Sequence, residues 1–383
     1  MTANAPSPGT GPPRAYPPGE HPDLPPPVAT AGILGWLREN LFSSLFNSAL
    51  TVVAVWLLYL FVSGVGGWMV FDSVLHADSR AACQAIDSGA CWAVVTTRLD
   101  QFVYGFYPPA ERWRPNLAFL LLLVALLPIL FGAVPLRRPL LWFAAAYPFV
   151  AAWLIYGGFG LPVVGTGQYG GFMLTLIIGV TGISASLPLG ILLALGRQSR
   201  LWALRVIATA FIEFSRGVPL ITLLFVASTM LNYFLPPGTS FDLLVRVLIM
   251  VSLFAAAYLA EAVRGGLQAI PRGQVEAAEA LGLSRWTTTR RIILPQALKI
   301  AIPGIVNVFV GLYKDTTLVV IIGLLDPLGI ARAVLADAKW NGLTTETYLF
   351  VALFFFLSCF AISRYSLWLE RRLATDRERR PTP

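Results

Sequence analysis

Eight apolar runs constrain this chain more than any other feature, because each is long enough to cross ~30 Å of hydrocarbon as a helix. They fall at about 49–71, 117–134, 139–156, 171–195, 217–235, 243–262, 301–325 and 347–368. Of the 383 residues, 56% are hydrophobic and 13% are charged, about half the charge usual in a soluble domain. Since a backbone in lipid must satisfy its own hydrogen bonds, we predict an all-α polytopic integral membrane protein.

The basic residues predict the orientation of these spans. With the N-terminus placed inside, most Lys and Arg residues fall on the inner side of the membrane, as the positive-inside rule requires. The formal net charge of +8 is explained in the same way, so no nucleic-acid partner is implied. Both termini and the loop between the sixth and seventh spans are therefore predicted to be cytoplasmic.

Both ends of the chain differ in composition from the spans. Residues 1–31 are rich in proline and poor in aliphatic side chains, which predicts a disordered cytoplasmic tail. Residues 32–48 place leucines on one helical stripe, which is compatible with an interfacial helix or with an extension of the first span. Residues 371–383 form a basic cytoplasmic tail.

A charged, alanine-rich loop joins the sixth and seventh spans over residues 263–299. We predict a helix over 274–281 that ends at Gly282, followed by a second helix that Ser284 caps and that runs toward Pro295. The small side chains of Ala277 and Ala278 leave the first helix thin, so it is compatible with docking into a cleft of another protein. It is equally compatible with a solvated hairpin that only joins two spans.

Several sequence blocks resemble the permease subunits of ABC importers of polar amino acids. Glu276-Ala277-Ala278, Gly282 and Ile293-Leu294-Pro295 resemble the cytoplasmic Glu-Ala-Ala loop of that family, which docks into the ATPase subunit. The other matching blocks, in the family's order, are Phe211–Leu220 with Glu213 and Arg216, Tyr258–Gly266 with Glu261 and Arg264, and Lys314–Leu318. Together they cover about the second half of the chain, and it is the set, rather than any one block, that is specific.

In the first half, the extra spans, the overall length and the segments Tyr107–Pro115 and Gly157–Leu161 resemble the longer, M-type permease of bacterial general L-amino acid transporters. The resemblance implies extra N-terminal transmembrane helices over 49–165, with a periplasmic excursion at 72–115, and a type I importer core over 166–370. It also implies a bacterial inner membrane location and transport by alternating access. The implied partners are a cytoplasmic ATPase dimer, a second permease subunit, a periplasmic amino-acid-binding protein and membrane lipid.

Charged residues inside a span are the candidates for a substrate pathway. Lys314 and Asp315 fall near the middle of the seventh run, where a charge costs about 2.5–3.5 kcal/mol on insertion scales and therefore usually faces protein or water. Thr316 and Thr317 add hydroxyl groups, and a helix broken here would offer amides and carbonyls to an amino acid. The alternative is a structural Lys-Asp pair.

Two further pairs of charges accompany the family blocks. Glu213 and Arg216 are spaced to pair with each other on one helix face at the inner surface, before Pro219 opens the fifth span. Glu261 and Arg264 read first as an interfacial ion pair, with Gly265-Gly266 permitting a turn.

The outer excursion holds two cysteines and an aromatic stretch. Cys83 and Cys91 stand where a disulfide persists once formed, so a bridge is an open possibility. Phe102, Tyr104, Phe106 and Tyr107 are compatible with an aromatic belt or with contact to a solute-carrying partner.

The residues present exclude most chemistry within the chain itself. No metal site is expected, because the three Cys and two His lack ligand spacing. None of the lysines stands in a Gly-Lys-Ser/Thr phosphate loop, so ATP and Mg²⁺ are expected on a partner ATPase, no cofactor on this chain, and no enzymatic activity. The rival function is an ion-coupled secondary carrier or channel without an ATPase.

Overall fold

The structure is a computed structural model that describes residues 32–86, 89–131, 134–230, 233, 236 and 241–373. The predicted tail at 1–31 and residues 374–383 of the tail predicted at 371–383 lie outside the described residues, whereas residues 371–373 continue helix α15. The chain divides into two units, Met1–Asp72 and Ser73–Pro383, which are taken separately below.

The first unit consists of two helices in sequence. Helix α1 (Gly32–Asn40) ends before α2 (Leu45–Gly66), which continues as the π turn η1 (Gly67–Phe71). Ser44 caps α2 by accepting from the amide of Asn47 at 3.1 Å. The segment after residue 32 is therefore a separate helix and not an extension of the first span.

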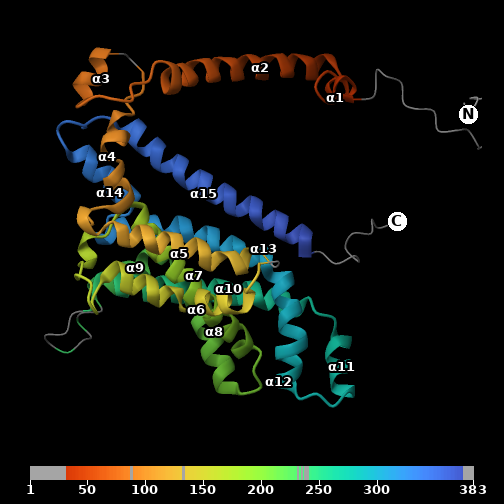
Figure 1. The fold of residues 1–383 in the computed structure, drawn as a ribbon. Coiled ribbons are helices and arrows are strands. Elements are labelled where there is room, and N and C mark those ends of the chain that lie inside the picture. The colour runs from red at the N-terminus through yellow and green to blue at the C-terminus, as the bar shows by residue number, and fades with distance from the viewer. Residues whose placement is uncertain are drawn as a thin grey trace, which may run out of the picture. The chain divides into compact units, whose positions relative to one another are not determined.

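The second unit is almost entirely helical among the residues that are described (Figure 1). In chain order its helices are α3 (Arg80–Ile86), α4 (Ala93–Tyr104), η2 (Pro109–Glu111), α5 (Trp113–Leu130), α6 (Arg137–Tyr156), η3 (Thr166–Gln168), α7 (Gly171–Arg197), α8 (Trp202–Gly217), α9 (Leu220–Thr229), α10 (Leu243–Gln268), α11 (Arg272–Ala280), α12 (Arg285–Thr288), η5 (Thr289–Ile293), α13 (Leu294–Asp315), η6 (Thr316–Ile322), α14 (Pro327–Ala336) and α15 (Thr344–Leu373).

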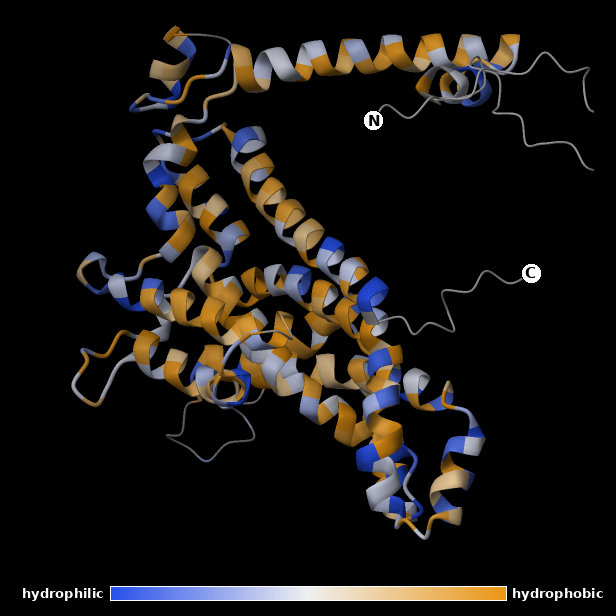
Figure 2. Cartoon of the chain, turned by 45° about the vertical axis from the view of Figure 1, so that its right-hand side comes forward, coloured by the Kyte–Doolittle hydropathy of each residue, from blue (hydrophilic) through white to orange (hydrophobic). Residues whose placement is uncertain are grey.

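Seven helices in the described part of the chain are long and apolar enough to cross a membrane. Their surfaces are dominated by hydrophobic residues, whereas α11 and α12 carry many hydrophilic ones (Figure 2). The predicted span at 217–235 opens after Pro219, as expected, but its described helix α9 has only 10 residues and is bent by 100° from α8, where the chain is extended at Val218 and Pro219. If this bent pair is one span, the chain has eight.

Buried Arg246 of α10 closes the described end of α9. Its Nη1 donates to the carbonyl oxygens of Ala227 at 3.3 Å and of Ser228 at 2.7 Å. The last carbonyls of a helix lack partners within the helix, so a guanidinium here satisfies them inside the protein. This contact explains how α9 ends so near its bend without exposing its carbonyls.

Helix α10 is the centre of the bundle and packs closely on α7 and α13. A Cβ added at Gly190 of α7 would lie 2.6 Å from Cβ of Leu259, and one at Gly266 would lie 2.2 Å from the carbonyl oxygen of Ala297. Small residues allow such approaches in membrane helices, where dispersion replaces the hydrophobic effect. Helix α10 continues to Gln268, so Gly265-Gly266 do not form the expected turn, and Gly266 instead lets α13 approach.

A head formed by α3, α4, α14 and the first turns of α15 sits on the bundle. Cys83 and Cys91 are joined as a disulfide with their Cα atoms 5.8 Å apart. The amide of Cys91 donates to the buried carboxylate of Glu346 at 3.3 Å, which joins this loop to α15.

Two aromatic residues of the head are interior, contrary to the aromatic belt considered from sequence. Phe102 is fully buried and its ring contacts Phe350 at 5.2 Å. Buried Tyr107 donates to the carbonyl oxygen of Ile155 at 2.8 Å.

Candidate functional site

Helix α11 lies beyond the end of α10, beside the stretch formed by α12 and η5 (Figure 1). Its start is Pro271, and its end is the left-handed Gly282, whose φ is 71°. The amide of Gly282 donates to the carbonyl oxygen of Glu279 at 2.9 Å, and the amide of Leu283 donates to the carbonyl oxygen of Ala278 at 3.1 Å. This is a pattern of C-terminal capping that glycine favours. The predicted end of the helix at Gly282 is therefore present, and its start lies two residues earlier than predicted.

Most of α11 is exposed. Glu276 and Ala277 face outward, and Ala278 alone is buried. Three apolar side chains are exposed beside them: Val275, Leu281 at 78% and Trp286 at 65%. Sequence reasoning did not select Leu281 or Trp286, although a tryptophan in a charged loop between spans is a signal for a contact surface. An apolar and acidic surface of this kind is suited to binding another protein.

The second helix after Gly282 does not stop at Pro295. Ser284 caps α12, accepting from the amide of Thr287 at 3.3 Å, and the chain then passes through the π turn η5 directly into α13. Leu294 and Pro295 open α13, where the missing proline amide costs little. One continuous helical stretch thus links α12 to η6.

A cluster of five charged residues, the Glu261 cluster, joins α7, α8 and α10. It consists of Arg197, Glu213, Arg216, Glu261 and Arg264. Glu261 is 17% exposed and is approached by three guanidinium groups, at 2.6 Å from Arg197, 2.7 Å from Arg264 and 3.7 Å from Arg216. The expected Glu261–Arg264 ion pair is present as part of this larger network.

The expected pairing of Glu213 with Arg216 is replaced by contacts to other helices. Glu213 lies 2.8 Å from Nη2 of Arg197, and Arg216 turns to Glu261 and to the ring of Tyr258, 5.8 Å away. Arg197 ends α7 and was counted from sequence only as a basic residue of an inner loop. Its role as the shared partner of two carboxylates depends on tertiary contacts that helix spacing does not encode.

Lys314 and Asp315 end α13, and η6 begins at Thr316. Lys314 is exposed, Asp315 is half-buried, and no ion pair joins them among the described residues. The hydroxyls of Thr316 and Thr317 donate to the carbonyls of Tyr313 and Lys314 at 2.7 and 2.9 Å. The α-helix changes to a 3-10 helix here, at the position where a helix break was considered from sequence. Lys314 and Asp315 do not pair with each other, so their charges are left for other contacts.

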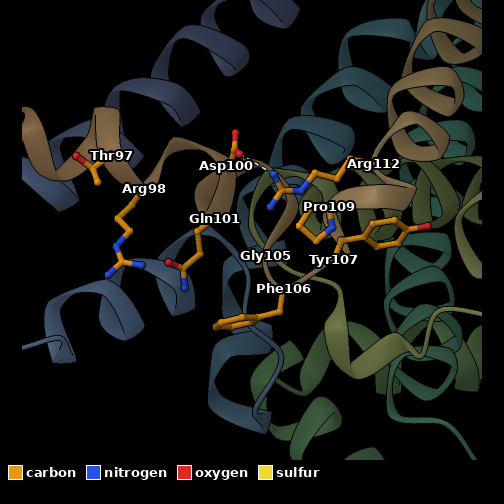
Figure 3. Close-up of a pocket in the computed structure, with 9 residues that line it drawn as sticks. All are labelled: Thr97, Arg98, Asp100, Gln101, Gly105, Phe106, Tyr107, Pro109 and Arg112. Carbon is orange, nitrogen blue, oxygen red and sulfur yellow. Dashed lines mark hydrogen bonds and ion pairs between the residues drawn. The ribbon is translucent and has the colours of Figure 1, made fainter.

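A pocket of ≈ 400 Å³ in the head lies between α4 and the segment that precedes α5. Figure 3 shows Arg98, Gln101 and Phe106 around it, and Tyr107 directed away from them. Its guanidiniums are engaged, since Arg112 lies 2.6 Å from Asp100 and Arg98 pairs with Asp337. Neither cation is isolated, so this pocket is a weaker candidate for the carboxylate of an amino acid than the surroundings of Lys314.

Among the described residues, no group of three or more His, Cys, Asp or Glu side chains is placed to hold a metal ion.

Comparison with known proteins gives consistent matches. Residues 186–375 match the family described as "Binding-protein-dependent transport system inner membrane component". The chain is 46% identical to the glutamate/glutamine/aspartate/asparagine transport system permease protein BztC of Rhodobacter capsulatus, over 92% of this chain and 96% of that protein. It is 47% identical to the inner membrane amino-acid ABC transporter permease protein YhdY of Escherichia coli K12, over 93% and 97%.

Among solved structures, the one titled "Crystal structure of an amino acid ABC transporter with histidines" is similar. It is 28% identical, with a TM-score of 0.48, over 52% of this chain and 91% of the other.

Proposed function

This chain belongs to the amino-acid ABC transporter permeases, and from that premise we propose that it moves L-amino acids from periplasm to cytoplasm by alternating access, driven by a separate ATPase. The ATPase dimer docks on α11 and α12. ATP and Mg²⁺ bind that partner. The chain works beside a second permease subunit and receives its solute from a periplasmic binding protein. Both termini lie in the cytoplasm, as the distribution of Lys and Arg favours.

The observation that carries the proposal is the exposed, rigidly capped α11 at the junction of α10 and α13. Glu276 supplies a charge, Ala277 keeps the surface thin, and Leu281 and Trp286 supply apolar area. An interface centred on an exposed aromatic with a polar rim is the usual form of a protein contact. An ion-coupled carrier has no need of such a surface, so the ATP-driven importer is favoured.

The transition would pass through the continuous helix from α12 into α13. A sideways movement of α11 acts on α10 at one end and on α12 at the other, and α13 carries it to Lys314 and Asp315. These charges and the amides at the start of η6 form the proposed pathway segment, where charge and hydrogen-bonding groups meet the substrate.

The test compares uptake with assembly. Glu276→Lys reverses the docking charge, and Gly282→Pro cannot adopt the positive φ that the capped turn needs. Both variants are expected to reach the membrane, to lose co-purification of the ATPase and to lose uptake of radiolabelled glutamate, glutamine, aspartate and asparagine, the solutes named for the relative BztC. The matched control is Gly273→Ala, where an added Cβ meets nothing within 4 Å. Normal uptake by Glu276→Lys would refute docking through α11.

A further inference from the structure

A large crevice separates the α5–α6 hairpin from the rest of the second unit. Its volume is ≈ 1580 Å³, and α5, α6, α7, α10, α13 and α15 all contribute to its lining. The hairpin is tied to the bundle at both ends of this crevice. At one end Tyr107 donates to the carbonyl oxygen of Ile155 of α6 at 2.8 Å, and its ring meets that of Tyr169 at 5.8 Å. At the other end the hydroxyl of Tyr365 of α15 donates to the carbonyl oxygen of Leu130 of α5 at 2.7 Å. The crevice is therefore held open between two fixed contacts.

The helices bordering the crevice are shaped to leave this space. Pro148 of α6 and Pro188 of α7 both line it, each inside a helix. A proline removes an internal hydrogen bond and bends a membrane helix at a fixed position. The gap between α6 and α7 is thus part of the shape that the sequence specifies.

One end of the lining, where α5 begins, α6 ends and α7 begins, carries a group of polar side chains: Tyr104, Asn116, Tyr156 and Thr166. The hydroxyl of Tyr104 donates to Oδ1 of Asn116 at 2.7 Å, which leaves the amide hydrogens of Asn116 as further donors at this end. Further hydroxyls of the lining, those of Thr181, Ser184 and Ser358, are spread along α7 and α15. A polar group at one end of a largely apolar lining matches an amphiphile with a single polar group.

The deeper lining is mostly apolar. The hydroxyl of Tyr147 is already satisfied by the carbonyl oxygen of Ala118 at 2.9 Å. In the described part of the chain, none of the buried side-chain atoms without a hydrogen-bond partner belongs to a residue of the lining. Since buried water needs two to four polar partners, hydrocarbon is the filling that this surface favours.

The crevice is continuous with the apolar outer surface of the hairpin. Phe119, Ile129 and Phe149 line it and are also exposed, at 48%, 58% and 77%. These residues lie on helices that cross the membrane, so the adjoining medium is lipid. An acyl chain can enter from the side without leaving hydrocarbon.

We propose that this crevice is a binding site for a membrane phospholipid, whose acyl chain lies between α6 and α7 and whose polar group meets Tyr104, Asn116 and Tyr156. The bound chain supplies the dispersion contacts that the hairpin and the bundle do not make with each other. The lipid thereby acts as a structural element that joins the hairpin to the bundle.

The first test measures retained lipid. The full chain, extracted from membranes with the subunits that accompany it, is exchanged into lipid-free detergent, and phospholipid per chain is counted by native mass spectrometry. Ala151 lines the crevice, whereas Ala146 on the same helix is exposed and does not line it. The unchanged chain and Ala146→Trp are expected to retain one phospholipid, and Ala151→Trp at least tenfold less. No retained lipid in the unchanged chain, or equal retention in both variants, overturns the proposal.

A second measurement keeps the test valid if Ala151→Trp fails to fold. The unchanged chain is reconstituted in vesicles of phosphatidylethanolamine that carries a photoreactive group in one acyl chain, and the labelled peptides are mapped. Labelling at Ala151 and Ala185, which line the crevice, supports the site, and labelling at Ala146, which is exposed on the same helix as Ala151, is the positive control for surrounding lipid. Labelled Ala146 beside unlabelled Ala151 and Ala185, or cross-linking of Ala151→Cys to a protein helix, shows that lipid does not occupy the crevice.

Discussion

Arg197 Nη1 lies 2.6 Å from Oε1 of Glu261, and Nη2 of the same guanidinium lies 2.8 Å from Oε1 of Glu213. Arg197, the last residue of α7, therefore holds α8 and α10 together close to the bend between α8 and α9. Because α10 leads directly to α11, this contact also fixes the base of the proposed ATPase-docking surface.

The Glu261 cluster predicts unequal effects of removing its two carboxylates. Glu261→Gln leaves three guanidiniums without their shared anion in a poorly exposed site, and we expect a loss of about 1–3 kcal/mol of stability. Glu213→Gln removes one contact of a half-exposed carboxylate, for which under about 1 kcal/mol is expected. Thermal unfolding of the purified assembly measures the difference. Equal losses in the two variants would show that Glu261 is not the centre of the cluster.

Adjacent glycines of α10 provide a matched test of the contact between α10 and α13. A Cβ at Gly266 would lie 2.2 Å from the carbonyl oxygen of Ala297, whereas at Gly265 it would meet nothing within 4 Å. We expect Gly266→Ala to force the helices apart, to cost about 1–3 kcal/mol and to lower uptake, because overpacking shifts the backbone.

The control, Gly265→Ala, is expected to be neutral or to stabilise slightly, because alanine is the better helix former. Thermal unfolding and uptake are measured on both variants. Similar behaviour of the two would contradict the close approach of Gly266 to α13.

The two glycines also show where sequence reasoning stopped. The all-helical fold, most of the spans and the capped turn at Gly282 follow from local signals: apolar length, turn residues and capping side chains. A Gly-Gly pair is ambiguous by those signals, since it permits either a turn or a close helix contact. Only the position of Ala297 on α13, thirty residues further along the chain, decides between them.

The Glu261 cluster was likewise only partly predictable from the sequence. Glu213, Arg216, Glu261 and Arg264 were selected from the family blocks, and the structure brings all four together. Their partners were not predictable, because spacing of three residues favours Glu213 with Arg216 whereas packing of α7 against α8 supplies Arg197 instead. Pairing across helices depends on the bundle, which no single segment encodes.

The pathway proposal predicts that Asp315→Asn separates transport from assembly. The substitution keeps the size of the side chain and removes its charge at the end of α13. If Asp315 contacts the ammonium group of a solute, uptake is expected to fall at least tenfold, about 1.4 kcal/mol or more, with unchanged ATPase co-purification. Thr317→Val, which removes only the hydroxyl bound to Lys314, serves as the comparison. Loss of the assembly instead of uptake would assign Asp315 a structural role.

Asp326 predicts a dependence of stability on pH outside the spans. It is fully buried at the start of α14, where its carboxylate accepts from the amides of Gly329 at 2.9 Å and Leu328 at 3.3 Å. Burial raises the pKa of Asp326 from 3.8 to about 6, although these amides and Arg332 oppose the shift. The folded state therefore binds the proton more tightly than the unfolded state does.

The sign of the effect follows from that difference in proton affinity. The contribution of Asp326 is fully present below about pH 4 and is lost as pH rises through about 6, by on the order of 3 kcal/mol. Asp326→Asn keeps a capping oxygen without the charge, so its apparent Tm relative to the unchanged chain is expected to rise between about pH 4 and 6. Asp78→Asn, which alters an exposed carboxylate, controls for net charge. Parallel Tm profiles for the unchanged chain and Asp326→Asn would mean that Asp326 does not change protonation in this range.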